Sequence, residues 1–179
     1  GGGISGIEHV ERIISLGVEK IALGNAAYKT PDLISEAAKR LGSQSVVAVL
    51  DVKKSASGDG YDVYTHNGKK NTGRNATSLA KEFQSMGAGE LLINSIENDG
   101  AMTGYDYDLI REIHAAVSLP ITALGGASSM SDCLELFKKF GVIGAAAGSM
   151  FVFKGKFKAV LIQYPTVEQK MEIFEKLGG

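Results

Sequence analysis

The chain has 179 residues, a length that suits one domain. Its 19 basic and 20 acidic residues leave a formal net charge of −1, which excludes the strongly basic surface typical of nucleic-acid or anionic-membrane binding. No apolar run reaches the roughly 18 residues of a membrane span, and the single cysteine, Cys133, fits a reducing setting such as the cytosol.

Helix and strand signals alternate along the chain. Apolar residues at helical spacing, bounded by glycine or proline, predict helices, and the short apolar runs between them predict strands. The run Val46 to Leu50, followed by Asp51, is typical of a strand buried on both faces of a parallel sheet. In chain order we expect helix 7–16, strand 20–23, helix 31–42, strand 46–50, helix 77–87, strand 90–95, helix 106–117, strand 120–124, helix 130–140 and strand 143–147.

Two segments depart from this alternation. Tyr61 to Thr65 alternates polar and apolar residues before Asn67-Gly68, so we expect a β-hairpin after Asp51. Thr166 and Gln169 form a capping-box pattern that predicts a last helix. The alternation as a whole predicts one α/β domain over 1–179 with a parallel sheet, closed or doubly wound, and an extension from about residue 154.

The chain also repeats itself at a shift of 124 positions. Gly1-Gly2 aligns with Gly125-Gly126, Gly17 with Gly141, and Gly24 with Gly148, without a gap. We interpret this match as a duplicated unit that consists of a strand end, a glycine pair, a helix, a strand, and a glycine followed by a polar residue.

Glycines at these strand ends predict two anion sites. The carboxyl ends of parallel strands face one side of the sheet, and glycine lets backbone N–H groups approach an anion closely. Two such sites indicate a ligand with a phosphate at each end. The alternative is that the glycines only permit tight turns. The predicted phosphate-binding residues are Gly3 and Asn25 in one copy, and Gly100, Gly126, Gly148 and Ser149 around the other.

Acidic residues follow two of the expected strands. Asp51 comes directly after its strand, where a carboxylate can act as a general acid or base; a helix cap or a loop turn is the alternative. Asp99 could serve the same pocket, although Asp-Gly is also an ordinary turn. Lys20 and Glu90 each precede a strand and so belong to the opposite end. The three histidines lack metal-ligand spacing, so no metal site is expected.

The most distinctive motif of the chain is the segment 87–100, which continues into Gly104-Tyr105-Asp106. Together with further motifs, it resembles the cyclase subunit of imidazole glycerol phosphate synthase. The resemblance covers Gly1 to about Phe153, and its other motifs are the Gly-Gly-Gly-Ile start, the segment 42–51, and Thr-His-Asn-Gly followed by Thr72-Gly73.

The resemblance implies an eight-fold (β/α) barrel that works in the cytoplasm without a cofactor. Such enzymes take ammonia from a partner glutaminase. They use it to cleave and cyclise a bisphosphorylated ribosyl-aminoimidazole carboxamide intermediate to imidazole glycerol phosphate, in histidine biosynthesis. By resemblance, Asp51 matches one of two catalytic aspartates and Asp99 a loop acid near the pocket. Lys20 and Glu90 match members of a charged ring where ammonia enters.

Some residues depart from the family pattern. Gly24-Asn25 stands where Asn-Thr or Asn-Ser is usual, and Asn94 replaces a commoner threonine. The segment 151–165 resembles a branch found with surface-polysaccharide genes, which puts nitrogen on a sugar as an acetamidino group. That amidation role is the second expected function, and a non-catalytic phosphate-binding or scaffold barrel is the third.

The strand count also departs from a complete barrel. The sequence predicts five strands and a stub at Gly1, whereas a complete barrel has eight strands and about 250 residues. If the two repeat copies hold strands three–four and seven–eight, the first two to three β/α units precede Gly1. We therefore expect a partial barrel that is inactive by itself.

Overall fold

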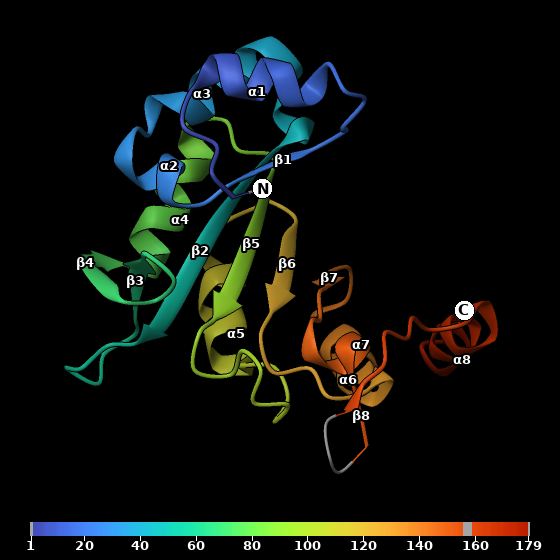
Figure 1. Cartoon of the computed structure of the whole chain (residues 1–179). Coiled ribbons are helices and arrows are strands. Elements are labelled where there is room, and N and C mark those ends of the chain that lie inside the picture. The colour runs from blue at the N-terminus through green and yellow to red at the C-terminus, as the bar shows by residue number, and fades with distance from the viewer. Residues whose placement is uncertain (1, 156–158, 179) are drawn as a thin grey trace.

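The computed structural model describes residues 2–155 and 159–178. Parallel strands form its centre in the order β1-β2-β5-β6-β7, which is also their order along the chain (Figure 1). A doubly wound sheet reverses its order at a switch point, so this order agrees with a barrel wall instead. These strands are β1 (Ile21–Leu23), β2 (Val46–Lys54), β5 (Glu90–Ser95), β6 (Ile121–Leu124) and β7 (Gly144–Ala145).

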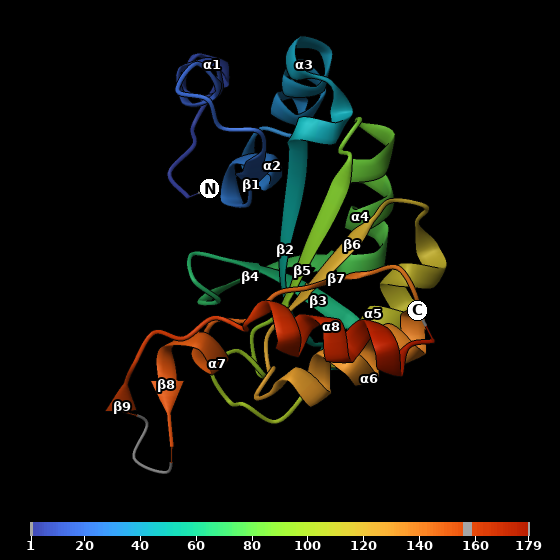
Figure 2. The ribbon, with the colours of Figure 1, turned by 90° about the vertical axis from the view of Figure 1, so that its right-hand side faces the viewer.

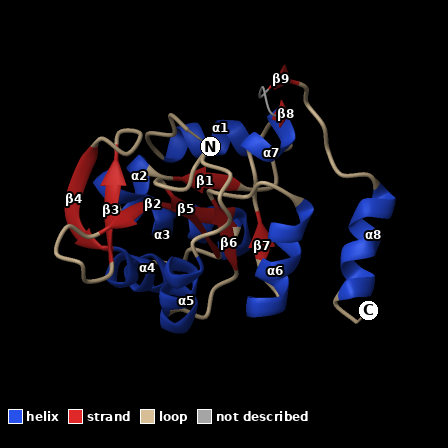
Figure 3. Cartoon of the chain, turned by 90° about the horizontal axis from the view of Figure 1, so that it is seen from below, coloured by secondary structure: helices blue, strands red, loops and turns tan. Residues whose placement is uncertain are grey.

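Helices cover one face of the strands and bury the core against it. Figure 3 shows α4, α5 and α6 along this side, and Ile34, Phe83 and Ile113 from three helices are almost fully buried there. The opposite face, called the interior face below, carries Val49, Asp51, Leu92 and Asn94, which are partly exposed. The helices are α1 (Ile7–Ile14), α3 (Asp32–Leu41), α4 (Ala76–Ser85), α5 (Tyr107–Ala116) and α6 (Met130–Phe140).

The predicted hairpin is confirmed as β3 (Tyr61–Thr65) and β4 (Lys70–Asn75), which pair antiparallel. The expected end of the preceding strand at Leu50 is wrong, because β2 continues to Lys54. Its last four residues pair with β3, from Asp51 opposite Tyr64 to Lys54 opposite Tyr61. The hairpin thus supplies the hydrogen-bond partners that extend β2 beyond the parallel sheet.

A hydrogen bond fixes this hairpin to the loop before α5. The Tyr61 hydroxyl donates to Asp106 Oδ1 at 2.9 Å, and the same oxygen accepts from the backbone N–H of Leu109, capping α5. Burial, and then the bond to Asp106, raise the pKa of the Tyr61 hydroxyl, so it remains protonated and continues to donate.

The remaining helices and strands lie within about two residues of their expected bounds. The sequence did not predict the short helices α2 (Asn25–Lys29), η1 (Ser43–Ser45) and α7 (Ser149–Val152), because one turn is too short to show a period. In the tail, β8 (Phe153–Lys154) pairs with β9 (Ala159–Val160). The predicted last helix is confirmed as α8 (Val167–Lys176), with its capping box formed; it lies alongside α6 (Figure 2).

The structure reproduces the sequence repeat. The first copy runs α1-β1-α2 and the second runs α6-β7-α7, and Gly24 and Gly148 begin the short helices. Gly17 and Gly141 follow the two longer helices with φ of 85° and 70°, a left-handed conformation that favours glycine. Within the described residues β1 and β7 do not pair with each other, so the wall formed by these strands is open.

Gly89 packs against the backbone before β2, which leads to a stability prediction. A Cβ added at residue 89 would lie 2.1 Å from the carbonyl oxygen of Ser43. Because a backbone atom cannot move aside easily, Gly89→Ala should lower the free energy of unfolding by about 1–3 kcal/mol, measured by urea denaturation.

The matched control is Gly6→Ala. Gly6 has extended backbone and no heavy atom within 4 Å of an added Cβ. As a helix N-cap, it should lose less than about 1 kcal/mol. Equal losses in the two variants would contradict the packing argument.

Candidate functional site

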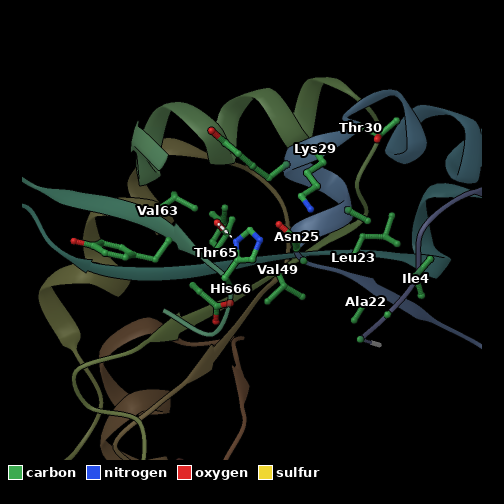
Figure 4. A pocket seen from close by; sticks show the side chains of 18 of the residues that line it. Ile4, Ala22, Leu23, Asn25, Lys29, Thr30, Val49, Val63, Thr65 and His66 are labelled. Atoms are coloured by element: carbon green, nitrogen blue, oxygen red, sulfur yellow. Dashed lines mark hydrogen bonds between the residues drawn. The ribbon is translucent and has the colours of Figure 1, made fainter. Parts of the chain in front are cut away.

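A cavity of about 560 Å³ lies at the carboxyl ends of β1 and β2 (Figure 4). Its apolar floor includes Leu23 and Val49. The structure brings three of the predicted site residues together here, namely Gly3, Asn25 and Asp51. Its other polar or charged lining residues are Ser5, Tyr28, Lys29, Thr30, Tyr64, Thr65, His66 and Asn67.

The glycines on one side of this cavity leave backbone groups bare. Gly2 and Gly3 have φ of 79° and 70°, which non-glycine residues rarely adopt, and no heavy atom lies within 4 Å of an added Cβ at either position. Gly24 precedes α2, where the first N–H groups have no acceptor within the helix. This wall can therefore offer N–H donors to an anion.

Asp51 lies on the interior face of β2, next to Asn94 of β5 in register. Asn94 Nδ2 donates to Asp51 Oδ1 at 2.9 Å. Among the described residues, Asp51 Oδ2 makes no hydrogen bond and Asn94 Oδ1 is buried without a partner. A buried unpaired polar atom costs about 1–3 kcal/mol of folding free energy. Asn94 therefore lowers stability through its Oδ1, while its Nδ2 holds Asp51 in place.

The second set of predicted phosphate-binding residues lies beyond the carboxyl ends of β5, β6 and β7. A Cβ added at Gly100 would lie 3.8 Å from Ser149 Oγ, so these two residues are neighbours. An added Cβ at Gly148 meets nothing within 4 Å.

Gly126 has a backbone contact of its own. An added Cβ there would lie 1.9 Å from the Gly104 carbonyl oxygen, and the Gly104 N–H donates to the Gly126 carbonyl at 2.8 Å. Loop packing therefore accounts for glycine at this position without an anion.

Asp99 lies apart from Asp51 in the structure. It is exposed in the turn after β5, its N–H donates to the Ser95 carbonyl at 2.9 Å, and it does not line the cavity that contains Asp51. Its role in catalysis stays a prediction.

Lys20 and Glu90 form an ion pair at the amino ends of β1 and β5, the end opposite the cavity. Lys20 Nζ lies 2.7 Å from Glu90 Oε2, and the Glu90 side chain is 17% exposed. Burial raises the pKa of Glu90, but hydrogen bonds from Lys20 and Thr122 outweigh it, and the pKa lies below its ordinary value. The carboxylate is therefore ionised at neutral pH.

The sequence did not single out Lys29 or His66, which also line the cavity. Figure 4 shows both side chains reaching toward the same space, Lys29 from α2 and His66 from the β3–β4 turn. His66 Nδ1 lies 3.0 Å from Thr65 Oγ1, and its backbone is left-handed, with φ of 55°. Lys29 comes four residues after Asn25, a spacing that places both side chains on one face of a helix. This spacing could have indicated that Lys29 lines the same cavity as Asn25.

The described residues contain neither a candidate metal site nor a candidate membrane span. In residues 2–155 and 159–178, no group of three or more His, Cys, Asp or Glu side chains could hold a metal ion. In the same ranges, no helix is long and apolar enough to cross a bilayer.

Comparison with known proteins assigns the chain to a family. The family model described as histidine biosynthesis protein matches residues 1–158. A Vibrio vulnificus protein provisionally named imidazole glycerol phosphate synthase subunit hisF3 is 46% identical over 98% of this chain and 67% of its own length. A Leptospira borgpetersenii protein, provisionally named as the HisF subunit, is 47% identical over 97% of this chain and 68% of its own length.

A third relative carries the name without the provisional mark. The imidazole glycerol phosphate synthase subunit HisF of Lactococcus lactis subsp. lactis is 39% identical over 84% of this chain and 58% of its own length. The chain thus spans about two-thirds of the length of the first two relatives. On these matches, the chain belongs to the HisF-like imidazole glycerol phosphate synthase subunit family.

Proposed function

We propose that the chain belongs to a cyclase-lyase that uses ammonia from a glutaminase partner. Its substrate would be the bisphosphorylated ribosyl-aminoimidazole carboxamide intermediate, and its product imidazole glycerol phosphate. The observation that carries the proposal is the cavity that joins Gly3, Asn25 and Asp51 at the carboxyl ends of parallel strands. An anion cradle beside a carboxylate fits a phosphorylated substrate whose reacting atoms undergo proton transfer.

One phosphate of the substrate would lie against Gly3, Gly24 and Asn25, where backbone N–H groups are accessible. Lys29 adds a positive charge on the same side of the cavity. The other phosphate would lie near Gly100, Gly148 and Ser149, beyond the carboxyl ends of β5 and β7. The repeat supports this pairing, since each copy contributes one glycine-led helix start.

Asp51 would act as the general acid and base between the phosphates. Asn94 holds Oδ1 in place, and Oδ2 is left to exchange a proton with the substrate or with the incoming ammonia nitrogen. Asp99 would assist as a second acid if its loop closes over the bound substrate, because the loop lies outside the cavity in this structure.

Ammonia would enter at the opposite end, at the Lys20–Glu90 pair. Between this pair and Asp51, the interior face carries Val47 and Val49 of β2 and Leu92 of β5. A small neutral molecule such as ammonia can pass over apolar side chains that offer it no competing hydrogen bonds.

The second candidate is amidation of a surface-polysaccharide sugar, with the same barrel chemistry. The segment 151–165 favours it, because this stretch departs from the histidine-pathway ending. Its described parts include the end of α7 and the strands β8 and β9. Either reaction would take place in the cytoplasm. The third candidate, a non-catalytic barrel, predicts ligand binding without turnover.

An assay of the complete protein separates the two catalytic candidates from the non-catalytic one. With ammonium salt and the bisphosphorylated intermediate, we expect imidazole glycerol phosphate to accumulate, detected by chromatography, and glutamine to replace the salt once the glutaminase is present. Binding of the intermediate without any product would reject the cyclase-lyase function in favour of the third candidate.

Substitution of Asp51 tests the acid–base role. Asp51→Asn keeps the side-chain shape but cannot exchange a proton, so kcat should fall by about 10²–10⁴-fold in the complete enzyme while KM changes little. Asp59→Asn, in the exposed loop before β3, is the control and should retain full activity. An unchanged kcat for Asp51→Asn would remove the residue from the mechanism.

Substitution of Lys29 tests the first phosphate site. Lys29→Ala should weaken the binding of inorganic phosphate by about tenfold, the effect of one hydrogen bond to a charged group. Binding would be followed by NMR shifts of the Gly3 and Asn25 amides. Lys39→Ala, exposed on α3, is the control. Phosphate that shifts neither amide in the wild-type chain would refute the site.

A further inference from the structure

A threonine on a third strand contacts the Lys20–Glu90 pair. Thr122 of β6 donates its hydroxyl to Glu90 Oε1 at 2.7 Å, while Lys20 Nζ lies 2.7 Å from Oε2. Both carboxylate oxygens of Glu90 therefore have a partner, one from each side. The contact links β1, β5 and β6 on the interior face.

Lys20 and Thr122, the two partners of the Glu90 carboxylate, differ in how much their side chains can move. The Lys20 side chain is 55% exposed and has four rotatable bonds, whereas threonine is restricted about its first side-chain torsion. The Thr122 hydroxyl is the fixed end of the contact. Without it, the Glu90 carboxylate can turn about its own axis and Lys20 can follow it into solvent.

Gly144 of β7 provides the space that Thr122 occupies. Thr122 and Gly144 are partners in register. A Cβ added at Gly144 would lie 2.2 Å from Thr122 Oγ1 and 3.0 Å from its Cβ. A side chain at residue 144 would therefore displace the hydroxyl from Glu90.

We propose that Thr122 is a positioning residue for the Lys20–Glu90 pair, because its hydroxyl holds one oxygen of Glu90 and presents the other to Lys20. Gly144 is required for this placement. The inference rests on the proposed entry of ammonia at this pair. There, Thr122 sets how long the pair stays closed when no ammonia is being delivered.

The test compares two replacements of Thr122. Thr122→Val keeps the branched shape and removes the hydroxyl, whereas Thr122→Ser keeps the hydroxyl. In the 179-residue chain, the Glu90 carboxyl is titrated by ¹³C NMR. Lys20 is the charged group that acts on Glu90. We expect the Glu90 pKa to rise toward its ordinary value in the valine variant and to stay low in the serine variant.

A second measurement uses the complete protein with its glutaminase. The valine variant should hydrolyse more glutamine per product formed, by up to about tenfold if one hydrogen bond to a charged group controls closure. Turnover with added ammonium salt should stay unchanged. Gly144→Ala should also raise the Glu90 pKa and increase glutamine hydrolysis per product, because the added methyl group pushes the Thr122 hydroxyl away from Glu90. This variant therefore removes the same hydrogen bond without a change at residue 122.

These outcomes separate the two proposals. A Glu90 pKa that is the same in the wild-type, valine and serine chains would overturn the positioning role. An unchanged ratio of glutamine hydrolysed to product formed in the valine variant would also overturn it. Failure of the wild-type protein to use ammonia would reject the proposed function instead. In that case the NMR titration still decides whether Thr122 holds Glu90.

Discussion

Strand β2 is the constraint on which the rest of the structure depends. It pairs with β1, β5 and β3, and its nine residues connect the parallel sheet to the hairpin. Val46, Ala48, Leu50 and Val52 are fully buried toward the helices. Because side chains alternate along a strand, this burial places Val47, Val49 and Asp51 on the interior face. The packing of its neighbours thus puts the catalytic candidate on this face, and the hydrogen bond from Asn94 orients its carboxylate.

The interior face has two chemically different ends. Asp51 and Asn94 are paired at the carboxyl end, and Lys20, Glu90 and Thr122 form a contact at the amino end. The register of β2 and β5 puts both groups on the same face, with apolar side chains between them. A shift of one residue in this register would turn either group toward the helices, so the sheet pairing itself couples the two ends.

The glycines that looked alike in the sequence serve different purposes. Gly2 and Gly3 have a left-handed backbone beside open space, as an anion cradle requires. Gly126 is needed because the Gly104 backbone approaches it, and Gly144 because Thr122 lies over it. A glycine at a strand end therefore indicates a binding site only where the space that its missing side chain leaves is accessible to a ligand.

The sequence by itself determined the α/β alternation, the hairpin and the last helix, because each depends on local periodicity or on turn and cap residues close in the chain. The repeat was visible as a direct match between two segments of the sequence. It also identified Asp51, Asn25 and Gly3, which the structure gathers around one cavity. Only the tertiary structure decided that β2 continues to Lys54, that Lys29 and His66 share the cavity, and that Thr122 contacts Glu90. The last two features join segments that are far apart in the chain, and the first depends on the register of β2 with β3. Strand pairing and register have no local signature in the sequence.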